Sequence, residues 1–192
     1  MRPNSTYDQV MMGEGGLWGW TARGALSAMS TAYRALIARR NNQFDRGARR
    51  THTLTAPVIS VGNITVGGTG KTPHTEYLTR LLFKDFRVAI LSRGYSRKSK
   101  NFVLANSTSS FQDLGDEPRQ YLQNFGDKIR VAVDKDRCRG VSSLLKMEYP
   151  PEVIILDDAF QHRFIKPGLS LLLTDYRRLY TDDYLFPSGM LR

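Results

Sequence analysis

The stretch from Val58 to Thr72 constrains this chain more than any other. A short apolar run enters a glycine-rich turn that ends in Gly-Lys-Thr-Pro, the residue order of a strand, a loop and a new helix. Glycines lack a Cβ atom, so backbone N–H groups can close around phosphate oxygens, and the helix N-terminus adds partial positive charge. The predicted phosphate-binding residues are Gly67, Gly68, Thr69, Gly70, Lys71 and Thr72.

Two residues of this loop carry the chemistry of phosphoryl transfer. Lys71 is expected to reach the β- and γ-phosphates of ATP, and the Thr72 hydroxyl is expected to ligate Mg2+. Thr65 departs from the usual pattern G-x-x-x-x-G-K-[ST], because it stands in the place of the first glycine. The strand before the loop, the helix after it and the glycines within it still favour a phosphate site over an ordinary turn.

A second apolar run, from Val153 to Leu156, ends in two carboxylates, Asp157 and Asp158. A parallel sheet places such residues at its carboxyl edge, beside the phosphate loop, where they can hold Mg2+ directly or through water. A solvated strand end is the alternative. The doubled aspartate, at a suitable distance after a phosphate loop, favours the metal site.

Five apolar runs alternate with helical stretches after residue 56. This alternation predicts an α/β fold of the P-loop NTPase type, with a mostly parallel sheet and helices on both faces. The predicted strands are 58–61, 87–92, 129–133, 153–156 and 169–173, and the predicted helices are 73–83, 117–124 and 135–147.

Residues 17–40 have the periodicity of an amphipathic helix. Its apolar face contains Leu26, Met29, Tyr33, Leu36 and Ile37. Two tryptophans at its start and several arginines after it are typical of a helix that lies on an anionic membrane, although packing against the protein's own core fits equally well. We therefore divide the chain into a membrane-associating arm, residues 1–50, and a P-loop core, residues 51–192.

The formal net charge of +10 indicates an anionic partner: phosphate ligands, acidic lipids or nucleic acid. No aromatic-rich RNA motif or helix-turn-helix pattern accompanies the arginines, so we expect no nucleic-acid partner. A single cysteine, Cys138, suits a reducing compartment and is expected to be an ordinary helix residue. We see no secretory signal and no uncharged run of about 18 residues, so we expect the protein on the cytoplasmic side.

Five motifs, taken in order, resemble the tetraacyldisaccharide 4'-kinase family of lipid A biosynthesis. They are the loop 58–74, Leu91-Ser-Arg-Gly-Tyr95, Gly115-Asp-Glu-Pro118, Asp157-Asp-Ala-Phe-Gln-His-Arg163 and Phe186-Pro-Ser-Gly-Met-Leu-Arg192. The family shares the threonine at position 65, whereas Ala159 stands where it usually has glycine. The resemblance runs from about Pro57 to the end and extends more loosely over the arm.

The resemblance implies transfer of the ATP γ-phosphate to the 4'-hydroxyl of a tetraacylated glucosamine disaccharide 1-phosphate. It implies a lipid acceptor and a peripheral or monotopic place at the cytoplasmic face of the bacterial inner membrane. It also makes Asp116 the general base, beside Lys71 in the catalytic site. On sequence alone, a helix N-cap before Glu117 and Pro118 is the favoured interpretation of Asp116, and the resemblance reverses that preference.

Four further residues are candidates for the acceptor site: Arg93, Arg97, Glu117 and His162. The arginines follow a strand end, where open parallel sheets bind ligands, but a solvated loop is an equal alternative. The family also has a C-terminal domain that contributes a histidine, and this chain stops within a family motif. We therefore expect a fragment with low turnover.

One other function shares the same phosphate loop and acidic strand. A P-loop ATPase switch would bind a membrane through its arm and would position a partner protein there. It would need neither a base at Asp116 nor a lipid acceptor, and its partner would stimulate ATP hydrolysis.

Overall fold

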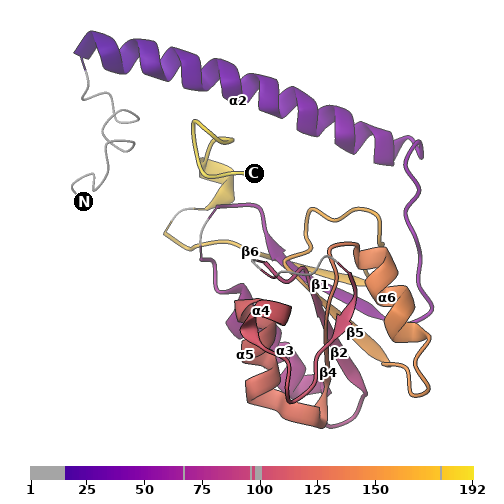
Figure 1. Cartoon of the computed structure of the whole chain (residues 1–192). Helices are drawn as coiled ribbons and strands as arrows, with labels where there is room; N and C mark the ends of the chain where they lie inside the picture. Colours follow the sequence, from indigo (N-terminus) through magenta and orange to yellow (C-terminus); the bar gives the residue numbers. More distant parts are fainter. Residues whose placement is uncertain (1–15, 67, 96, 98–100, 178) are drawn as a thin grey trace. The chain divides into compact units, whose positions relative to one another are not determined.

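The computed structural model describes residues 16–192, except residues 67, 96, 98–100 and 178 (Figure 1). The chain divides into two compact units. The smaller unit comprises Met1–Arg49, Ile64–Gly67 and Thr174–Arg192, and the larger comprises Arg50–Asn63 and Gly68–Leu173. The first boundary lies close to the one that we expected, but the last 19 residues group with the arm and not with the P-loop core.

The larger unit is built on a six-stranded sheet of order β3-β4-β2-β5-β1-β6. The strands are β1 (Val58–Asn63), β2 (Val88–Ser92), β3 (Val103–Leu104), β4 (Arg130–Val133), β5 (Val153–Asp157) and β6 (Leu169–Leu173). Only β3 pairs in the antiparallel direction, at one edge of the sheet. All five predicted strands are confirmed, whereas the two residues of β3 carry no periodicity that could have predicted a strand.

Helices cover both faces of this sheet, as the continuous apolar runs predicted. In Figure 1, α3, α4 and α5 lie on one face and α6 lies on the other. Their bounds are α3 (Lys71–Leu82), α4 (Phe111–Leu114), α5 (Asp116–Phe125) and α6 (Arg137–Leu145), with the short 3-10 helix η1 (Gly126–Lys128) after α5. Two buried clusters result: Tyr121 and Phe125 of α5 pack in the first, and Val141 and Leu144 of α6 pack in the second.

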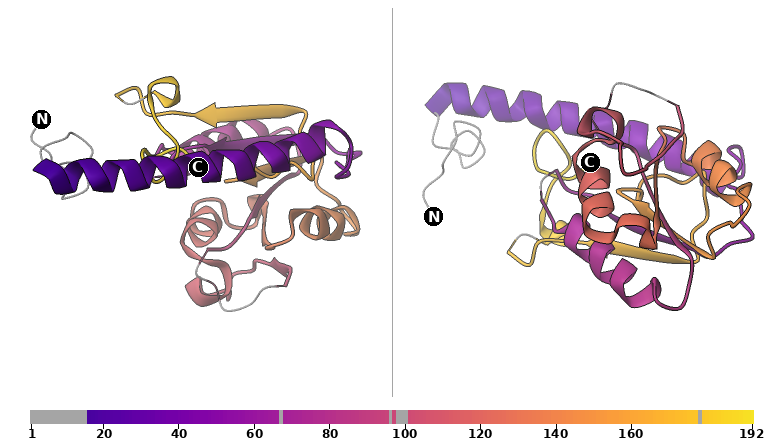
Figure 2. Two further views of the ribbon diagram at one scale, coloured as in Figure 1. Left: turned by 90° about the horizontal axis from the view of Figure 1, so that it is seen from above. Right: turned by 60° about the horizontal axis from the view of Figure 1, so that its bottom comes forward.

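The smaller unit contains the long helix α2 (Gly16–Asp45) and the 3-10 helix η2 (Tyr180–Asp182). The helix is continuous in both views of Figure 2 and extends beyond the predicted range 17–40 at both ends. Its Ser30 hydroxyl donates to the backbone oxygen of Leu185 at 2.9 Å and lies 2.8 Å from the Ser188 hydroxyl. These contacts explain why the last residues of the chain group with the arm.

The start of the phosphate loop also belongs to this smaller unit. Thr65 forms an antiparallel bridge with Leu191, and the Val66 N–H donates to the Met190 carbonyl at 2.7 Å. A strand-like pairing needs no left-handed backbone, so a threonine is acceptable where other phosphate loops have their first glycine.

No helix in the described part of the chain is both long enough and apolar enough to cross a bilayer.

Candidate active site

The predicted phosphate loop leads into the N-terminus of α3. This helix begins at Lys71, directly after Gly70, whose φ of 78° is a left-handed conformation that favours glycine. Asn63, the last residue of β1, donates from Nδ2 to Thr69 Oγ1 at 2.9 Å and so holds the loop before the helix. The predicted positions Thr69, Lys71 and Thr72 therefore surround a helix N-terminus, whose free N–H groups attract anions.

Of the first two glycines predicted to bind phosphate, the structure describes only Gly68. Gly68 is exposed, and a Cβ atom there would meet nothing within 4 Å, so the space above the loop is open for a ligand. Gly67 lies outside the described residues.

The acidic pair stands at the carboxyl edge of the sheet, next to the loop. Strand β5 pairs with β1 in parallel, with Asp157 opposite Val61, and so ends beside the start of the phosphate loop. The following residue, Asp158, has a φ of 48°, a conformation that non-glycine residues rarely adopt. Its Oδ1 lies 3.8 Å from the Lys71 ammonium, which joins the loop to the acidic pair.

Asp157 differs from its neighbour in burial. Burial, together with the carboxylates of Asp158 and Glu117, raises the pKa of Asp157 to about 6. Three carboxylates thus act on one another at this edge of the sheet. Such a site favours a cation, because a cation relieves both the desolvation and the mutual repulsion.

Arg137 supports the same strand end from the other face of the sheet. Its side chain is buried, and its Nη2 donates to the Asp157 carbonyl at 3.0 Å. Burial lowers the pKa of Arg137 to about 10, although Asp157 opposes that shift. A buried arginine that binds a backbone carbonyl holds the turn after β5 in place.

Asp116 and Glu117 form the first turn of α5, and both side chains are exposed. The helix starts here because Gly115 takes a φ of 90°, which breaks the short helix α4 from α5. Glu117 lies close enough to Asp157 for its charge to raise the pKa of that carboxyl. The N-terminus of α5 is therefore close to the acidic pair.

Close packing of two glycines joins two motifs that are 20 residues apart in the chain. A Cβ atom on Gly115 would lie 2.5 Å from the Tyr95 carbonyl oxygen, and one on Gly94 would lie 2.7 Å from the Leu114 carbonyl oxygen. Only glycine allows both approaches. The loop that follows β2 is thereby held directly against the residue that precedes Asp116.

The two arginines of that loop have different surroundings. Arg93 is exposed at the end of β2, and its charge lowers the pKa of Arg137. Arg97 donates from Nη1 to the Asn101 carbonyl at 2.7 Å and to the Val133 carbonyl at 3.4 Å. Arg93 is thus exposed at the carboxyl edge, whereas Arg97 joins its own loop to the end of β4.

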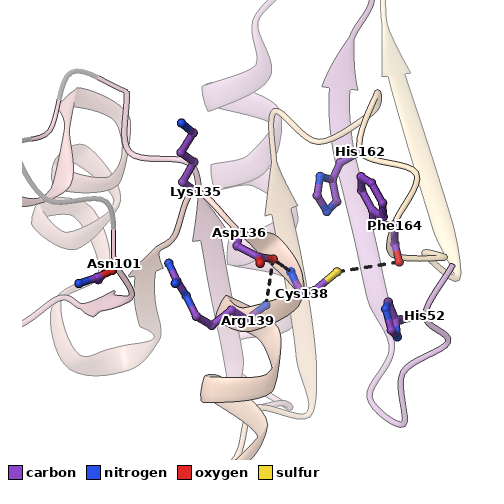
Figure 3. Close-up of a pocket in the computed structure, with 8 residues that line it drawn as sticks. All are labelled: His52, Asn101, Lys135, Asp136, Cys138, Arg139, His162 and Phe164. Carbon is purple, nitrogen blue, oxygen red and sulfur yellow. Dashed lines mark hydrogen bonds between the residues drawn. The ribbon is translucent and has the colours of Figure 1, made fainter. Parts of the chain in front are cut away.

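His162 lines a cavity of about 650 Å³ on the α6 side of the sheet (Figure 3). In this view Asn101 and Lys135 lie on one side of the cavity, and His52, His162 and Phe164 lie on the other. The remaining lining residues, Asp136, Cys138 and Arg139, belong to α6 or to the residue that caps it. Cys138 is a half-buried helix residue, as expected, and burial raises the pKa of its thiol.

Several residues of the site could not be found from the sequence. Gly62 is required because a Cβ atom there would lie 2.6 Å from Phe160 Cβ, in the turn after the acidic pair. Tyr121 is fully buried and has Thr72, Thr75 and Asp157 as polar neighbours. Tyr121 lies on α5 outside any recognisable motif, so a single sequence does not indicate that it belongs to the site. The same is true of Glu76 on α3.

A mostly parallel sheet, a glycine loop that leads into α3 and an acidic strand end beside it define a P-loop protein of the NTPase and kinase class. The family model for tetraacyldisaccharide-1-P 4'-kinase matches residues 22–192. The chain belongs to this family.

Similar proteins agree with this assignment. The chain is 57% identical over 169 residues to a tetraacyldisaccharide 4'-kinase of Phocaeicola vulgatus, and 56% identical over 164 residues to one of Bacteroides fragilis. These matches cover 87% and 85% of this chain, but 46% and 43% of the relatives. The chain thus spans about half the length of the curated relatives that it matches.

The fold is also found in a solved structure. The crystal structure of "apo" form LpxK from Aquifex aeolicus in complex with ATP matches with a TM-score of 0.79 and 41% sequence identity. The match covers 89% of this chain and 54% of that chain.

Proposed function

We propose that the protein is a lipid kinase, which transfers the γ-phosphate of ATP to the 4'-hydroxyl of a tetraacylated glucosamine disaccharide 1-phosphate. The observation that carries the proposal is the position of α5. Its first turn brings Asp116 and Glu117 to the carboxyl edge of the sheet, where Glu117 acts on Asp157 of the acidic pair. A phosphate loop alone fits any ATPase, whereas a kinase also needs a carboxylate next to the transferred phosphate.

ATP would bind with its phosphates at the N-terminus of α3. The helix offers its free N–H groups there, and Lys71 offers a positive charge that is now 3.8 Å from Asp158. A phosphate attracts an ammonium at least as strongly as one carboxylate does, so Lys71 can move from Asp158 to the β- and γ-phosphates. Asp158 would then contribute a carboxylate to a bound cation.

Magnesium fits the residues at this edge. Within the described part of the chain, no three His, Cys, Asp or Glu side chains converge at metal distance. Mg2+ usually needs only one or two carboxylates together with substrate phosphates and water, and Asp157, Asp158 and the Thr72 hydroxyl provide that set. The bound ion would neutralise negative charge on the phosphates during transfer.

Asp116 would act as the general base. It is exposed at the start of α5, so an acceptor hydroxyl can reach it. The carboxylate accepts the hydroxyl proton as the oxygen attacks the γ-phosphorus, and the bond to the leaving ADP oxygen breaks. Gly94 and Gly115 keep this residue against the loop that carries Arg93.

The acceptor would lie along the same edge. Arg93 is exposed in the loop that Gly94 and Gly115 hold against the start of α5, and it can bind a phosphate or a sugar oxygen, as Glu117 of the same helix turn as Asp116 can bind a hydroxyl. His162 offers a second contact at the cavity of Figure 3. Arg97 would contribute indirectly, because its bonds to the backbone shape the loop that presents Arg93.

The lipid acceptor places the protein at a membrane surface, which we propose to be the cytoplasmic face of the bacterial inner membrane. Helix α2 supports this proposal. It exposes Met29 and Leu36 on one side, and exposed arginines, Arg39 and Arg40, follow them in the same helix. Apolar side chains beside arginines are what a helix needs at an anionic interface.

The test of the base is Asp116→Asn in the complete product of the gene. The amide cannot accept the proton, so kcat for lipid phosphorylation should fall by about 10²- to 10⁴-fold. The affinity for ATP should stay unchanged, because the nucleotide is bound by α3 and the acidic pair. Asp127→Asn, at an exposed position in η1 after the end of α5, is the matched control. Equal activity of the two variants would contradict the role of Asp116.

A further inference from the structure

Glu76 is a buried carboxylate for which the proposed mechanism has no direct use. It lies on α3 with only 7% of its surface exposed. Lysine, glutamate, arginine and aspartate are rarely buried to this degree unless hydrogen bonds or opposite charges compensate. Its surroundings therefore show what it holds.

Three donors converge on this carboxylate. Gln120 Nε2 and Asn124 Nδ2, both on α5, donate to Oε1 at 2.7 Å each, and Arg80 Nη2 donates to Oε2 at 2.8 Å. Burial raises the pKa of Glu76, but these donors outweigh it and leave the pKa below its usual value. The carboxylate is thus a charged acceptor that joins two helices.

The hydrogen bond between Glu76 and Gln120 lies one helical turn from Thr72 on α3 and one helical turn from Asp116 on α5. On α3, Glu76 follows Thr72 by four residues, and on α5, Gln120 follows Asp116 by four residues. Residues four apart lie on the same face of a helix, about 5–6 Å apart. Hydrogen bonds at this level therefore set the position of the base relative to the phosphate loop.

Apolar packing alone would not set that position. The inner face of α5, with Tyr121, Leu122 and Phe125, packs in a hydrophobic cluster. Hydrophobic contact is non-directional and permits a helix to rotate or slide, whereas hydrogen bonds have narrow distance and angle requirements. Two donors on one oxygen add the directional constraint that the cluster lacks.

We propose that Glu76 is a positioning residue for phosphoryl transfer: it aligns α5, and with it Asp116, on the helix that binds the phosphates. This inference rests on the proposed function for its catalytic consequence. The structural consequence is independent of the proposed function: α5 loses its alignment when the carboxylate is removed.

The test is Glu76→Gln, which keeps the shape but removes the charge and replaces one acceptor oxygen by an NH2 group, so that the three donors can no longer all be accepted. We expect kcat to fall at least about tenfold while the KM for ATP changes less than about twofold, because misplacement by 1 Å of a reacting group is costly and the ATP contacts are untouched. Glu152→Gln is the control, because it makes the same chemical change in an exposed ion pair with Arg87.

A reciprocal variant separates positioning from general damage. Glu76→Gln combined with Gln120→Glu restores an acceptor and a donor across the two helices. We expect kcat to recover to within about threefold of the unsubstituted enzyme, as coupled residues do in a double-mutant cycle. If Glu76→Gln does not fold, Gln120→Met removes a single donor and takes its place.

Hydrogen exchange tests the alignment without any catalysis. In Glu76→Gln, the amides of α5 should exchange faster while those of α6 keep their protection. Unchanged hydrogen exchange in α5 would overturn the inference. So would a reciprocal variant whose kcat is as low as that of Glu76→Gln alone. If the unsubstituted enzyme makes no phosphorylated lipid, the proposed function fails, and the exchange result still decides whether Glu76 aligns α5.

Discussion

At the scale of residues, the most informative contact is the one between Lys71 and Asp158. Their 3.8 Å separation shows two site residues of opposite charge that satisfy each other before any ligand does. A phosphate for the lysine and a cation for the aspartate would replace that contact together. The geometry therefore suggests that nucleotide and metal bind with mutual support.

Tyr121 allows a prediction on stability. Its side chain is fully buried, and among the described residues its hydroxyl has no partner with hydrogen-bonding geometry. Burying an unpaired hydroxyl costs about 1 kcal/mol or more. Tyr121→Phe should therefore raise the free energy of unfolding of the ligand-free protein by about 1 kcal/mol, measured by urea denaturation.

Tyr149→Phe is the control for this prediction, because Tyr149 is 64% exposed and its hydroxyl is solvated. A lower stability of Tyr121→Phe would show that the hydroxyl is paired in solution, with Thr72, Thr75 or Asp157 as the candidate partner.

Local chemistry explains which residues could be predicted. Lys71 and Thr72 follow a glycine loop, and Asp157 ends an apolar run, so each carries its signal in its own neighbourhood. Glu76 has no such signal, because its partners Gln120 and Asn124 lie 44 and 48 residues away in the sequence. Only the fold brings them together.

At the scale of elements, periodicity predicted the helices and strands of the larger unit well. Periodicity was less informative for α2, because only part of its expected apolar face is covered in the structure. Leu26, Tyr33 and Ile37 are half-buried, whereas Met29 and Leu36 are 59% and 65% exposed. A sequence pattern shows that a helix has an apolar side, but it cannot show how much of that side the protein itself covers.

The exposed part of α2 leads to a prediction on membranes. Met29→Glu combined with Leu36→Glu should reduce binding to anionic vesicles by at least about tenfold, because it removes apolar insertion and adds like charge to the surface. Vesicle sedimentation measures this directly. Glu substitutions at the exposed polar positions Ser27 and Asn42 provide a control with the same change in charge. Unchanged binding of the Met29 and Leu36 variant would contradict the role of α2.

At the scale of the whole molecule, the sequence predicted the sheet but not the grouping of its last residues. Residues 174–192 were expected in the P-loop core, yet Ser30 of α2 is bonded to Leu185 and lies against Ser188. These contacts span more than 150 residues, and no local pattern encodes them. The family assignment extends over both units, since the family model matches residues 22–192.

The measurement that tests the central claim most directly is transfer of labelled γ-phosphate from ATP to a tetraacylated glucosamine disaccharide 1-phosphate in detergent micelles. The complete product of the gene would be used, with Asp116→Asn beside it. The account predicts a labelled lipid whose label survives removal of the acid-labile 1-phosphate, and little labelled lipid from the variant. ATP hydrolysis without labelled lipid, equal in the two proteins, would contradict the account and favour a membrane-bound ATPase switch.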